Sequence, residues 1–360
     1  MNKNYYVAIM AGGIGSRFWP VSRTGRPKQF LDILGIGKTL IQSTFERFAS
    51  FIPKENIYVI TADEYVPLVR EQLTEISDEQ ILSEPWRKNT APCIAYISYK
   101  LAQRDPDGCL LCAPADHLIL DTTTFVKTAL EAFEFVKTHK ALITLGIKPL
   151  YPNTGYGYIQ YEQEAVSDNV YKVKTFTEKP NIELAQTFIA SGDFLWNAGI
   201  FVWQTKNIIT AFEKYLPEMH EVFSAEQSQF NTLGERAAIE RIYPQCSNIS
   251  IDYGIMEKAD NVYIIPSSFG WSDLGTWNSA YDNFEKDYYG NAVSGNDVMV
   301  IDARNCMVHA PTNKLHVLQG LEGYIVIDTN DVLLICKKDQ EQQIKDYVAE
   351  VKRNKGDKYL

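Results

Sequence analysis

The sequence predicts an α/β fold in which a large domain with a mixed, mostly parallel sheet is followed by a small β-rich unit. Short apolar runs alternate with helix-length stretches in the first half, and the pattern becomes mixed near residue 156. After about residue 285, short β-type runs are separated by Asn, Asp and Gly. A chain of 360 residues exceeds one average domain of about 100–200 residues. We therefore expect domains at 1–284 and 285–360.

The elements of the first half are expected in alternating order. Strands are expected at 5–11, 57–62, 109–115 and 141–147, and helices at 40–51, 64–73, 91–103 and 124–138. Strands joined by helices of this length form βαβ units, whose parallel sheet is covered on both faces. This burial explains why the strands are apolar throughout rather than alternately apolar and polar.

The second half is expected to add mixed strands and then a small β unit. Strands are expected within 156–161, 170–179 and 195–203, and helices at 181–191, 206–216 and 233–243. Beyond residue 285, β-type runs lie at 298–302, 306–310, 315–320, 324–329 and 332–337, and a polar helix is expected near 340–352.

Composition argues against several classes of partner. Asp and Glu total 45 and Lys and Arg 35, a net charge of −10, whereas proteins that coat nucleic acid need a basic surface. No run approaches the roughly 18 apolar residues of a membrane span, so no membrane partner is expected. The apolar run at 5–11 ends in glycines rather than at a cleavage site, so no signal peptide is expected.

The six cysteines predict buried thiols in a cytoplasmic, reducing compartment. Most of them lie in apolar runs. Cys109 and Cys112 have the C-x-x-C spacing of redox and zinc sites. On a buried strand, however, this spacing sends the two side chains to opposite faces, and the sequence has no second C-x-x-C.

A basic, glycine-rich loop follows the first strand and suggests an anion site. The segment AGGIGSRFWPVSRTGRPKQFL spans residues 11–31, and Gly12, Gly13 and Gly15 let the backbone and its N–H groups approach a ligand. Residues 1–31 contain five Lys or Arg and no Asp or Glu. Because ligands of open α/β sheets bind at the carboxyl ends of strands, this loop indicates a phosphorylated small molecule.

The loop fits neither of two common phosphate-binding patterns. It lacks the Gly-Lys-Ser/Thr of a Walker A loop. Read from Gly13, its spacing is G-x-G-x-x-F, so the third glycine of a dinucleotide fingerprint is absent. A plain glycine-rich turn remains an alternative, and Arg23 and Arg26 are either ligands or solvated side chains.

Eight segments in order carry a resemblance to the sugar-1-phosphate nucleotidylyltransferase family. They are GGIGSRFWPVSRTGRPKQFL (12–31), EPWRKNTAPC (84–93), PADH (114–117), GYGYI (155–159), FTEKP (176–180), WNAGIF (196–201), IDYGIMEK (251–258) and GWSDLGTW (270–277). The resemblance is strongest to members that use GTP and mannose 1-phosphate. The chain departs from it at Arg87 and Lys88, where the family commonly has Gly-Arg, and at Ala198, where many members have Ser.

The resemblance implies transfer of GMP from GTP to mannose 1-phosphate, giving GDP-mannose and pyrophosphate. An oxygen of the sugar phosphate would attack the α-phosphorus while pyrophosphate leaves in line. The nucleophile is already an anion, so positioning and electrostatics matter more than a strong base. Two alternatives stay open: another hexose 1-phosphate or nucleotide, and a catalytically silent paralogue that acts as a regulatory subunit.

The family also implies roles for individual residues. The resemblance assigns catalytic cations to Arg17, Lys28 and Lys179, nucleotide contacts to Gly12, Gly13, Gly15, Asn89 and Thr90, sugar contacts to Gly157, Glu178 and Asn197, and Mg²⁺ (or Mn²⁺) ligands to Asp116 and Asp273. Mg²⁺ commonly binds one or two carboxylates with phosphate oxygens and water. Asp252 and Lys258 receive no role.

The last unit resembles the short left-handed β-helix-like tail of these enzymes. Exposed β edges of such a tail suit a homodimer. About 75 residues follow Glu285, too few for both this tail and a cupin barrel, so no isomerase activity is expected.

Overall fold

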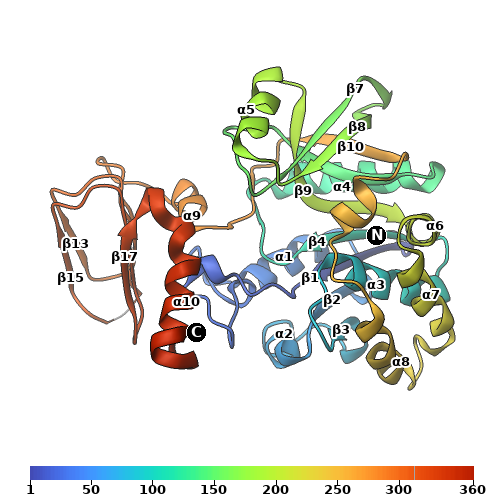
Figure 1. Ribbon diagram of the computed structural model, residues 1–360, viewed down its shortest axis with the longest axis horizontal. Coiled ribbons are helices and arrows are strands. Elements are labelled where there is room, and N and C mark those ends of the chain that lie inside the picture. Colours follow the sequence, from blue (N-terminus) through green and yellow to red (C-terminus); the bar gives the residue numbers. More distant parts are fainter. Residues whose placement is uncertain (312) are drawn as a thin grey trace. The chain divides into compact units, whose positions relative to one another are not determined.

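The computed structural model describes residues 1–311 and 313–360, and the chain forms two compact units (Figure 1). Unit 1 comprises residues 1–12, 44–115 and 119–271. Unit 2 comprises residues 13–43, 116–118 and 272–360. The basic loop that begins at Gly13 therefore belongs to the same compact unit as the C-terminal β strands.

Unit 1 is built on a nine-stranded sheet with the order β3-β2-β1-β4-β9-β6-β10-β8-β7. Its strands are β1 (Tyr5–Met10), β2 (Ile57–Ala62), β3 (Ile81–Glu84), β4 (Cys109–Pro114), β6 (Leu142–Ile147), β7 (Gly157–Ser167), β8 (Val170–Glu178), β9 (Phe194–Gln204) and β10 (Val262–Ser267). The ladders show that only β8 and β9 run against the other strands of this sheet. The predicted mixed, mostly parallel sheet is confirmed.

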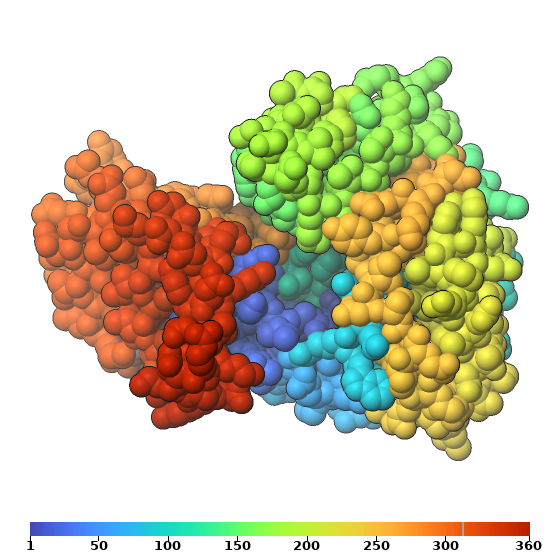
Figure 2. Space-filling view, in the orientation of Figure 1, coloured from blue at the N-terminus to red at the C-terminus, as the bar shows by residue number. Residues whose placement is uncertain are grey.

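Helices cover both faces of this sheet (Figure 1). The helices are α1 (Leu40–Ala49), α2 (Val66–Gln72), α3 (Thr90–Arg104), α4 (Thr122–Thr138), α5 (Ile182–Ser191), α6 (Thr205–Tyr215), α7 (Pro217–Ala225) and α8 (Glu235–Ile242). The Tyr5 ring stacks on Phe133 of α4 at 4.2 Å between centroids, whereas its neighbour Tyr6 packs in the cluster that includes α3, α6 and α7. Adjacent residues of one strand thus bury opposite faces. The chain from α6 to α8 gathers on one part of the unit's surface (yellow in Figure 2).

Side-chain caps explain where several of these helices begin. Asp121 accepts a hydrogen bond from the Thr124 amide at 3.0 Å before α4, and Asn181 accepts one from the Leu184 amide at 2.9 Å before α5. Each cap satisfies one of the amides that a first helical turn leaves unpaired. Residue 181, predicted as helical, is therefore the cap of α5.

Unit 2 contains two small sheets of mostly parallel strands. One sheet has the order β12-β14-β16-β17, and the other pairs β13 with β15. The strands are β12 (Ala292–Ser294), β13 (Val298–Ile301), β14 (Met307–His309), β15 (His316–Gln319), β16 (Tyr324–Asp328) and β17 (Leu333–Lys337). Successive strands alternate between the two sheets as far as β16, and only the β16–β17 ladder is antiparallel. This arrangement confirms the β-helix-like character of the C-terminal unit.

The basic loop supplies a large share of the core of unit 2. Phe18 and Trp19 of the loop are buried with Trp277 of α9 (Trp277–Asn283) and Ile344 of α10 (Ile344–Lys355). The Phe18 and Trp277 rings lie 4.8 Å apart between centroids. Two short strands, β5 (Leu118–Ile119) and β11 (Trp271–Ser272), span places where the chain passes from one unit to the other.

The six cysteines meet the expectation of buried thiols. All six cysteines are buried free thiols, and burial raises the pKa of Cys109 to about 12 and that of Cys112 beyond the usual range. Over residues 1–311 and 313–360, no helix has the length and apolar character needed to cross a membrane.

Candidate active site

Lys28 joins three distant segments of unit 2. Its Nζ lies 2.8 Å from the Asp116 carboxylate and donates to the carbonyls of Asp273 and Leu274, each at 2.9 Å. The side chain is only 4% exposed. An ammonium has three donors, and these three acceptors match them. The resemblance assigns a catalytic cation to Lys28, and in the structure this cation is buried against the Asp116 carboxylate and the backbone of Asp273.

The electrostatics around Lys28 keep Asp116 ionised. Burial alone would raise the pKa of Asp116, but the charges of Lys28 and His117 and the hydrogen bond from Lys28 outweigh it and lower this pKa. The carboxylate of Asp273 is oriented by its own turn, because its Oδ1 accepts the Gly275 amide at 2.8 Å.

Asp116 and Asp273 form a donor set that fits a hard cation. Two carboxylates contributed by segments that share one lysine offer oxygen ligands, which Mg²⁺ and Mn²⁺ prefer. Among residues 1–311 and 313–360, no cluster of three or more His, Cys, Asp or Glu side chains forms a metal site. An Mg²⁺ ion held by two carboxylates takes its remaining ligands from substrate phosphates and water.

The glycines of the loop allow a tight backbone path beside Lys28. Gly15 has φ +66°, and a Cβ there would lie 2.5 Å from the Cβ of Lys28, so only glycine fits. Gly13 has open space around its Cα, and its carbonyl accepts the Gln29 side-chain amide at 2.9 Å.

Arg17 lies on the short helix η1 (Ser16–Phe18), against which α10 packs. Its Nε is buried and has no hydrogen-bond partner in the described part of the chain. The charge of Arg17 also lowers the pKa of Lys345 on α10. Two cations near one another with an unsatisfied donor indicate that this place favours an anion.

Unit 1 brings the three predicted sugar ligands together. Gly157 and Glu178 are directly paired between β7 and β8. A Cβ at Gly157 would lie 2.4 Å from Glu178 Oε2 and 3.2 Å from the Cβ of Asn197. Glu178 Oε2 is buried without a partner among the described residues. A buried carboxylate oxygen without a donor is costly, so this oxygen points to a ligand that brings one.

Asp252 belongs to the same cluster, although the sequence gave it no role. Its Oδ1 accepts Asn197 Nδ2 at 2.8 Å, and Asn197 Oδ1 accepts the Thr144 hydroxyl at 2.8 Å. Burial and the nearby charge of Glu178 raise the pKa of Asp252 to about 7. Because Asp252 lies 55 residues from Asn197, no local pattern signals this contact.

Lys179 extends beside this cluster, and its side chain is 55% exposed. Its Nζ contacts the Glu178 carboxylate. Burial opposes the charge of Lys179, but its hydrogen bond to Glu178 and the charges of Glu178 and Asp252 raise its pKa. Lys179 is thus a cation available at the edge of the cluster formed by Gly157, Glu178, Asn197 and Asp252, called the sugar cluster below.

Asn89 and Thr90 connect the α3 terminus to the segment before Asp252. The Asn89 side chain accepts the Thr90 amide at 2.9 Å, and Asn89 has a positive φ of 69°. The Thr90 hydroxyl accepts the Ile251 amide at 2.8 Å. Arg87 and Lys88, which stand where the family commonly has Gly-Arg, both have partners in the structure. Arg87 pairs with Glu64, and Lys88 donates to the Cys246 carbonyl at 3.1 Å.

Glu84 is a buried carboxyl group that the sequence reasoning missed. It ends β3, and its Oε1 accepts the Tyr243 hydroxyl at 2.9 Å. A Cβ at Gly12 would lie 3.5 Å from Glu84 Oε2, so this oxygen faces the end of β1. Burial raises the pKa of Glu84 to about 8. Its place at the carboxyl end of a strand, where ligands of open α/β sheets bind, is the sequence signal that could have found Glu84.

The fold and these clusters define a nucleotidyltransferase, and the chain belongs to the nucleotidyl transferase family, whose sequence profile matches residues 6–289. A second profile, described as a MannoseP isomerase/GMP-like beta-helix domain, matches residues 295–351.

Relatives with specific names resemble nearly the whole chain. A mannose-1-phosphate guanylyltransferase of Salmonella montevideo is 37% identical over 352 residues, 96% of this chain and 73% of the relative. The alginate biosynthesis protein AlgA of Pseudomonas putida is 36% identical over 94% of this chain and 70% of its own length. A solved structure from Thermus thermophilus, described as a mannose-1-phosphate geranyltransferase, matches with a TM-score of 0.87 and 30% identity over 97% of this chain and 99% of that one.

Proposed function

We propose that this chain transfers GMP from GTP to mannose 1-phosphate, giving GDP-mannose and pyrophosphate. The observation that carries the proposal is the buried Lys28, which holds Asp116 and the backbone of Asp273 beside the glycine loop. The similarity to a mannose-1-phosphate guanylyltransferase over 96% of the chain supports this substrate pair.

The protein's main task in this reaction is to position anions. The sugar phosphate is a ready nucleophile, so its oxygen attacks the α-phosphorus without a strong base, and pyrophosphate leaves in line. Arg17 offers a planar fork to the triphosphate and stabilises charge that grows on the departing pyrophosphate. Gly13 and Gly15 let backbone amides approach the same phosphates. Lys28 contributes its positive charge and fixes Asp116 and the Asp273–Leu274 segment.

Asp116 and Asp273 would hold Mg²⁺ or Mn²⁺. When bound, the cation neutralises phosphate charge and polarises the reacting phosphorus. Because the pKa of Asp116 is lowered, its carboxylate stays ionised and ready to bind a cation at neutral pH.

The Gly157, Glu178 and Asn197 cluster binds the sugar. Glu178 Oε2 is the buried oxygen that lacks a donor, and a sugar hydroxyl supplies one. Gly157 leaves the space that the sugar ring needs, and Asn197 orients the neighbouring Asp252. Lys179, beside this cluster, neutralises the phosphate of the sugar.

Gly12, Asn89, Thr90 and Glu84 bind the nucleoside. Guanine presents two adjacent N–H donors on one edge, whereas uracil and thymine present only one there, and such donors favour the ionised form of a nearby carboxyl group. Glu84 faces Gly12 at the end of β1 and supplies that carboxyl group, whose raised pKa of about 8 the donors of a bound guanine would lower.

The enzyme is proposed to act as a cytoplasmic homodimer. Apolar side chains remain exposed on the β-helix-like unit, among them Met299, Val317, Leu333 and Ile335. A second copy that covered these side chains would remove their contact with water.

The proposed metal ligands provide the first test. Asp116→Asn and Asp273→Asn each remove a charge, and each is expected to lower turnover at least about a hundredfold, because the phosphates lose charge stabilisation. Pyrophosphate release with GTP, mannose 1-phosphate and Mg²⁺ measures it. Asp78→Asn, at an exposed ion pair with Arg70, is the control and should keep wild-type rates. Wild-type rates in both test variants would exclude the assignment.

A further inference from the structure

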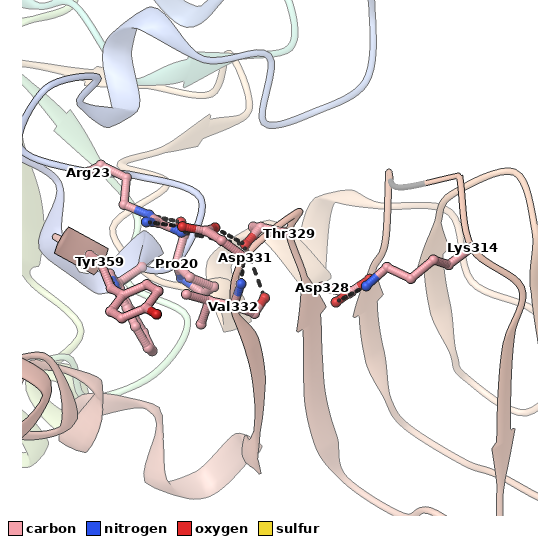
Figure 3. A network of polar contacts seen from close by, with 9 residues as sticks. Pro20, Arg23, Lys314, Asp328, Thr329, Asp331, Val332 and Tyr359 are labelled. Atoms are coloured by element: carbon pink, nitrogen blue, oxygen red, sulfur yellow. Dashed lines mark hydrogen bonds and ion pairs between the residues drawn. The ribbon is translucent and has the colours of Figure 1, made fainter. Parts of the chain in front are cut away.

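Arg23 fastens the basic loop to the turn between β16 and β17 (Figure 3). Its Nη2 lies 2.8 Å from Asp331 Oδ1, and its Nη1 lies 3.1 Å from Asp331 Oδ2. The Asp331 Oδ1 also accepts the Thr329 hydroxyl at 3.1 Å. The contact is therefore a two-pronged guanidinium–carboxylate pair whose acid is oriented by its own turn, and such geometry is specific as well as attractive.

Arg23 contacts the loop on both sides of itself, through its guanidinium before it and through its backbone after it. Its Nε donates to the Pro20 carbonyl at 2.6 Å. The backbone of Arg23 exchanges two hydrogen bonds with Arg26, at 3.2 and 3.0 Å. Arg17 lies three residues before Pro20, and Lys28 lies two residues after Arg26. The position of Arg23 therefore influences where Arg17 and Lys28, the two proposed catalytic cations of the loop, leave the backbone.

Side-chain packing alone does not fix the part of the loop around Arg23. A pocket of about 290 Å³ lies beside the ion pair and is lined by Pro20, Val21, His309 and Asn330, among others. The loop is held from the other side, where the Trp19 indole N–H donates to the Tyr359 carbonyl at 2.7 Å and α10 packs on η1. With open space on one side, the Asp331 carboxylate is the charged group that restrains the end of the Arg23 guanidinium, beside a longer contact from Nη2 to the Thr329 hydroxyl at 3.5 Å.

We infer that Asp331 is a positioning residue for the nucleotide: it never touches substrate but sets the loop that carries Arg17 and Lys28 through its paired contact with Arg23. The inference rests on the proposed function, because it takes the loop to be the triphosphate-binding loop. It also assigns Arg23, which the sequence left either as a ligand or as a solvated side chain, to the framework of the loop. A partly exposed ion pair adds little to global stability, so its expected effect is on loop position.

The test compares the kinetic constants for GTP with those for mannose 1-phosphate. Asp331→Ala and Asp331→Asn are expected to lower kcat/KM for GTP about tenfold, because small displacements of positioning groups reduce rates strongly. The KM for mannose 1-phosphate at saturating GTP is expected to change less than about twofold. The exchange Arg23→Asp with Asp331→Arg restores the pair and should recover most of the lost GTP efficiency.

The ion pair between Glu226 and Arg241 provides a matched control for the Asp331 variants. Glu226→Ala breaks another paired Arg–carboxylate contact, with Arg241 in unit 1, and should leave both substrates' constants unchanged. Unchanged GTP constants in the Asp331 variants, or equal losses for both substrates with no recovery in the exchange variant, would overturn the inference. Arg17→Gln tests the underlying assignment separately: if it leaves GTP use intact, the proposed loop function fails, whatever the Asp331 variants show.

Discussion

At the scale of single residues, the sugar cluster contains a carboxyl group that resists ionisation. Asp252 lies near Glu178 and is buried, and these two causes raise its pKa from an ordinary 3.8 to about 7. Asn197 donates to Asp252, and Lys179 partly offsets the repulsion. Near neutral pH, gain or loss of the proton on Asp252 therefore changes the net charge of this cluster.

This raised pKa predicts a pH dependence of stability. Between about pH 4 and 7 the folded chain retains a proton on Asp252 that the unfolded chain has lost, so this contribution to stability is lost as pH rises through that window. Asp252→Asn removes the contribution, so the variant's thermal midpoint should fall less than the wild type's over this range, by a difference on the order of a few degrees.

Thermal unfolding at pH 4.5 and 7.5 (~3 units apart) measures this difference. Asp260→Asn, at an exposed ion pair with Lys214, is the control and should follow the wild type. An equal change of the thermal midpoint between the two pH values in the wild type and in Asp252→Asn would contradict the account.

The family resemblance placed several candidate residues in one site, but the sequence did not predict the contacts that each of them makes. Lys28, Asp116 and Asp273 were expected in one site from the family resemblance, and the structure joins them through one ammonium. The burial of Lys28 depends on carbonyls from residues 273 and 274, and no local pattern reports such a contact. For the same reason the roles of Arg23 and Asp252, whose partners are distant in sequence, were not predictable.

At the scale of elements, the sugar cluster depends on three adjacent strand segments. Gly157 begins β7, Glu178 ends β8, and Asn197 lies within β9. The β7–β8 and β7–β9 ladders fix their register, so the three side chains meet without a dedicated loop. Placing ligands on strands gives them little freedom to move, which suits the recognition of directional hydroxyls.

Gly157→Ala tests this arrangement. The added methyl group would lie 2.4 Å from Glu178 Oε2 and must displace that side chain. We expect the KM for mannose 1-phosphate to rise about tenfold while the KM for GTP stays within about twofold. Gln163→Ala, at an exposed position of the same strand, is the control. Unchanged constants for mannose 1-phosphate in initial-rate assays would argue against the sugar assignment.

The elements that sequence reasoning missed share weak local signals. The four-residue edge strand β3 is alternately half-buried and buried, and β10 contains Pro266. The helix α7 begins at Pro217 directly after α6, so its apolar pattern merges with that of its neighbour. In contrast, the mostly apolar strands β1, β2, β4 and β6 were placed within one residue, because near-complete burial leaves a clear sequence pattern.

At the scale of the whole molecule, each compact unit is built from segments that are not consecutive in the sequence. The loop from Gly13 to Ser43 is grouped with residues 272–360, since Phe18, Trp19 and Ile33 are buried in the core that also holds Trp277 and Ile344. Compact packing therefore groups residues that a division of the chain at 284/285 separates. The consequence is functional, because residues of the C-terminal β unit contact the proposed triphosphate loop directly.

The central claim is tested most directly by an initial-rate matrix of four nucleoside triphosphates against several hexose 1-phosphates, with pyrophosphate release as the readout. The account predicts rapid release only when GTP, mannose 1-phosphate and Mg²⁺ are present together, with every other pair at least about tenfold less efficient. No pyrophosphate from any pair would contradict the assignment of an enzyme, and preference for a different pair would contradict the assigned substrates.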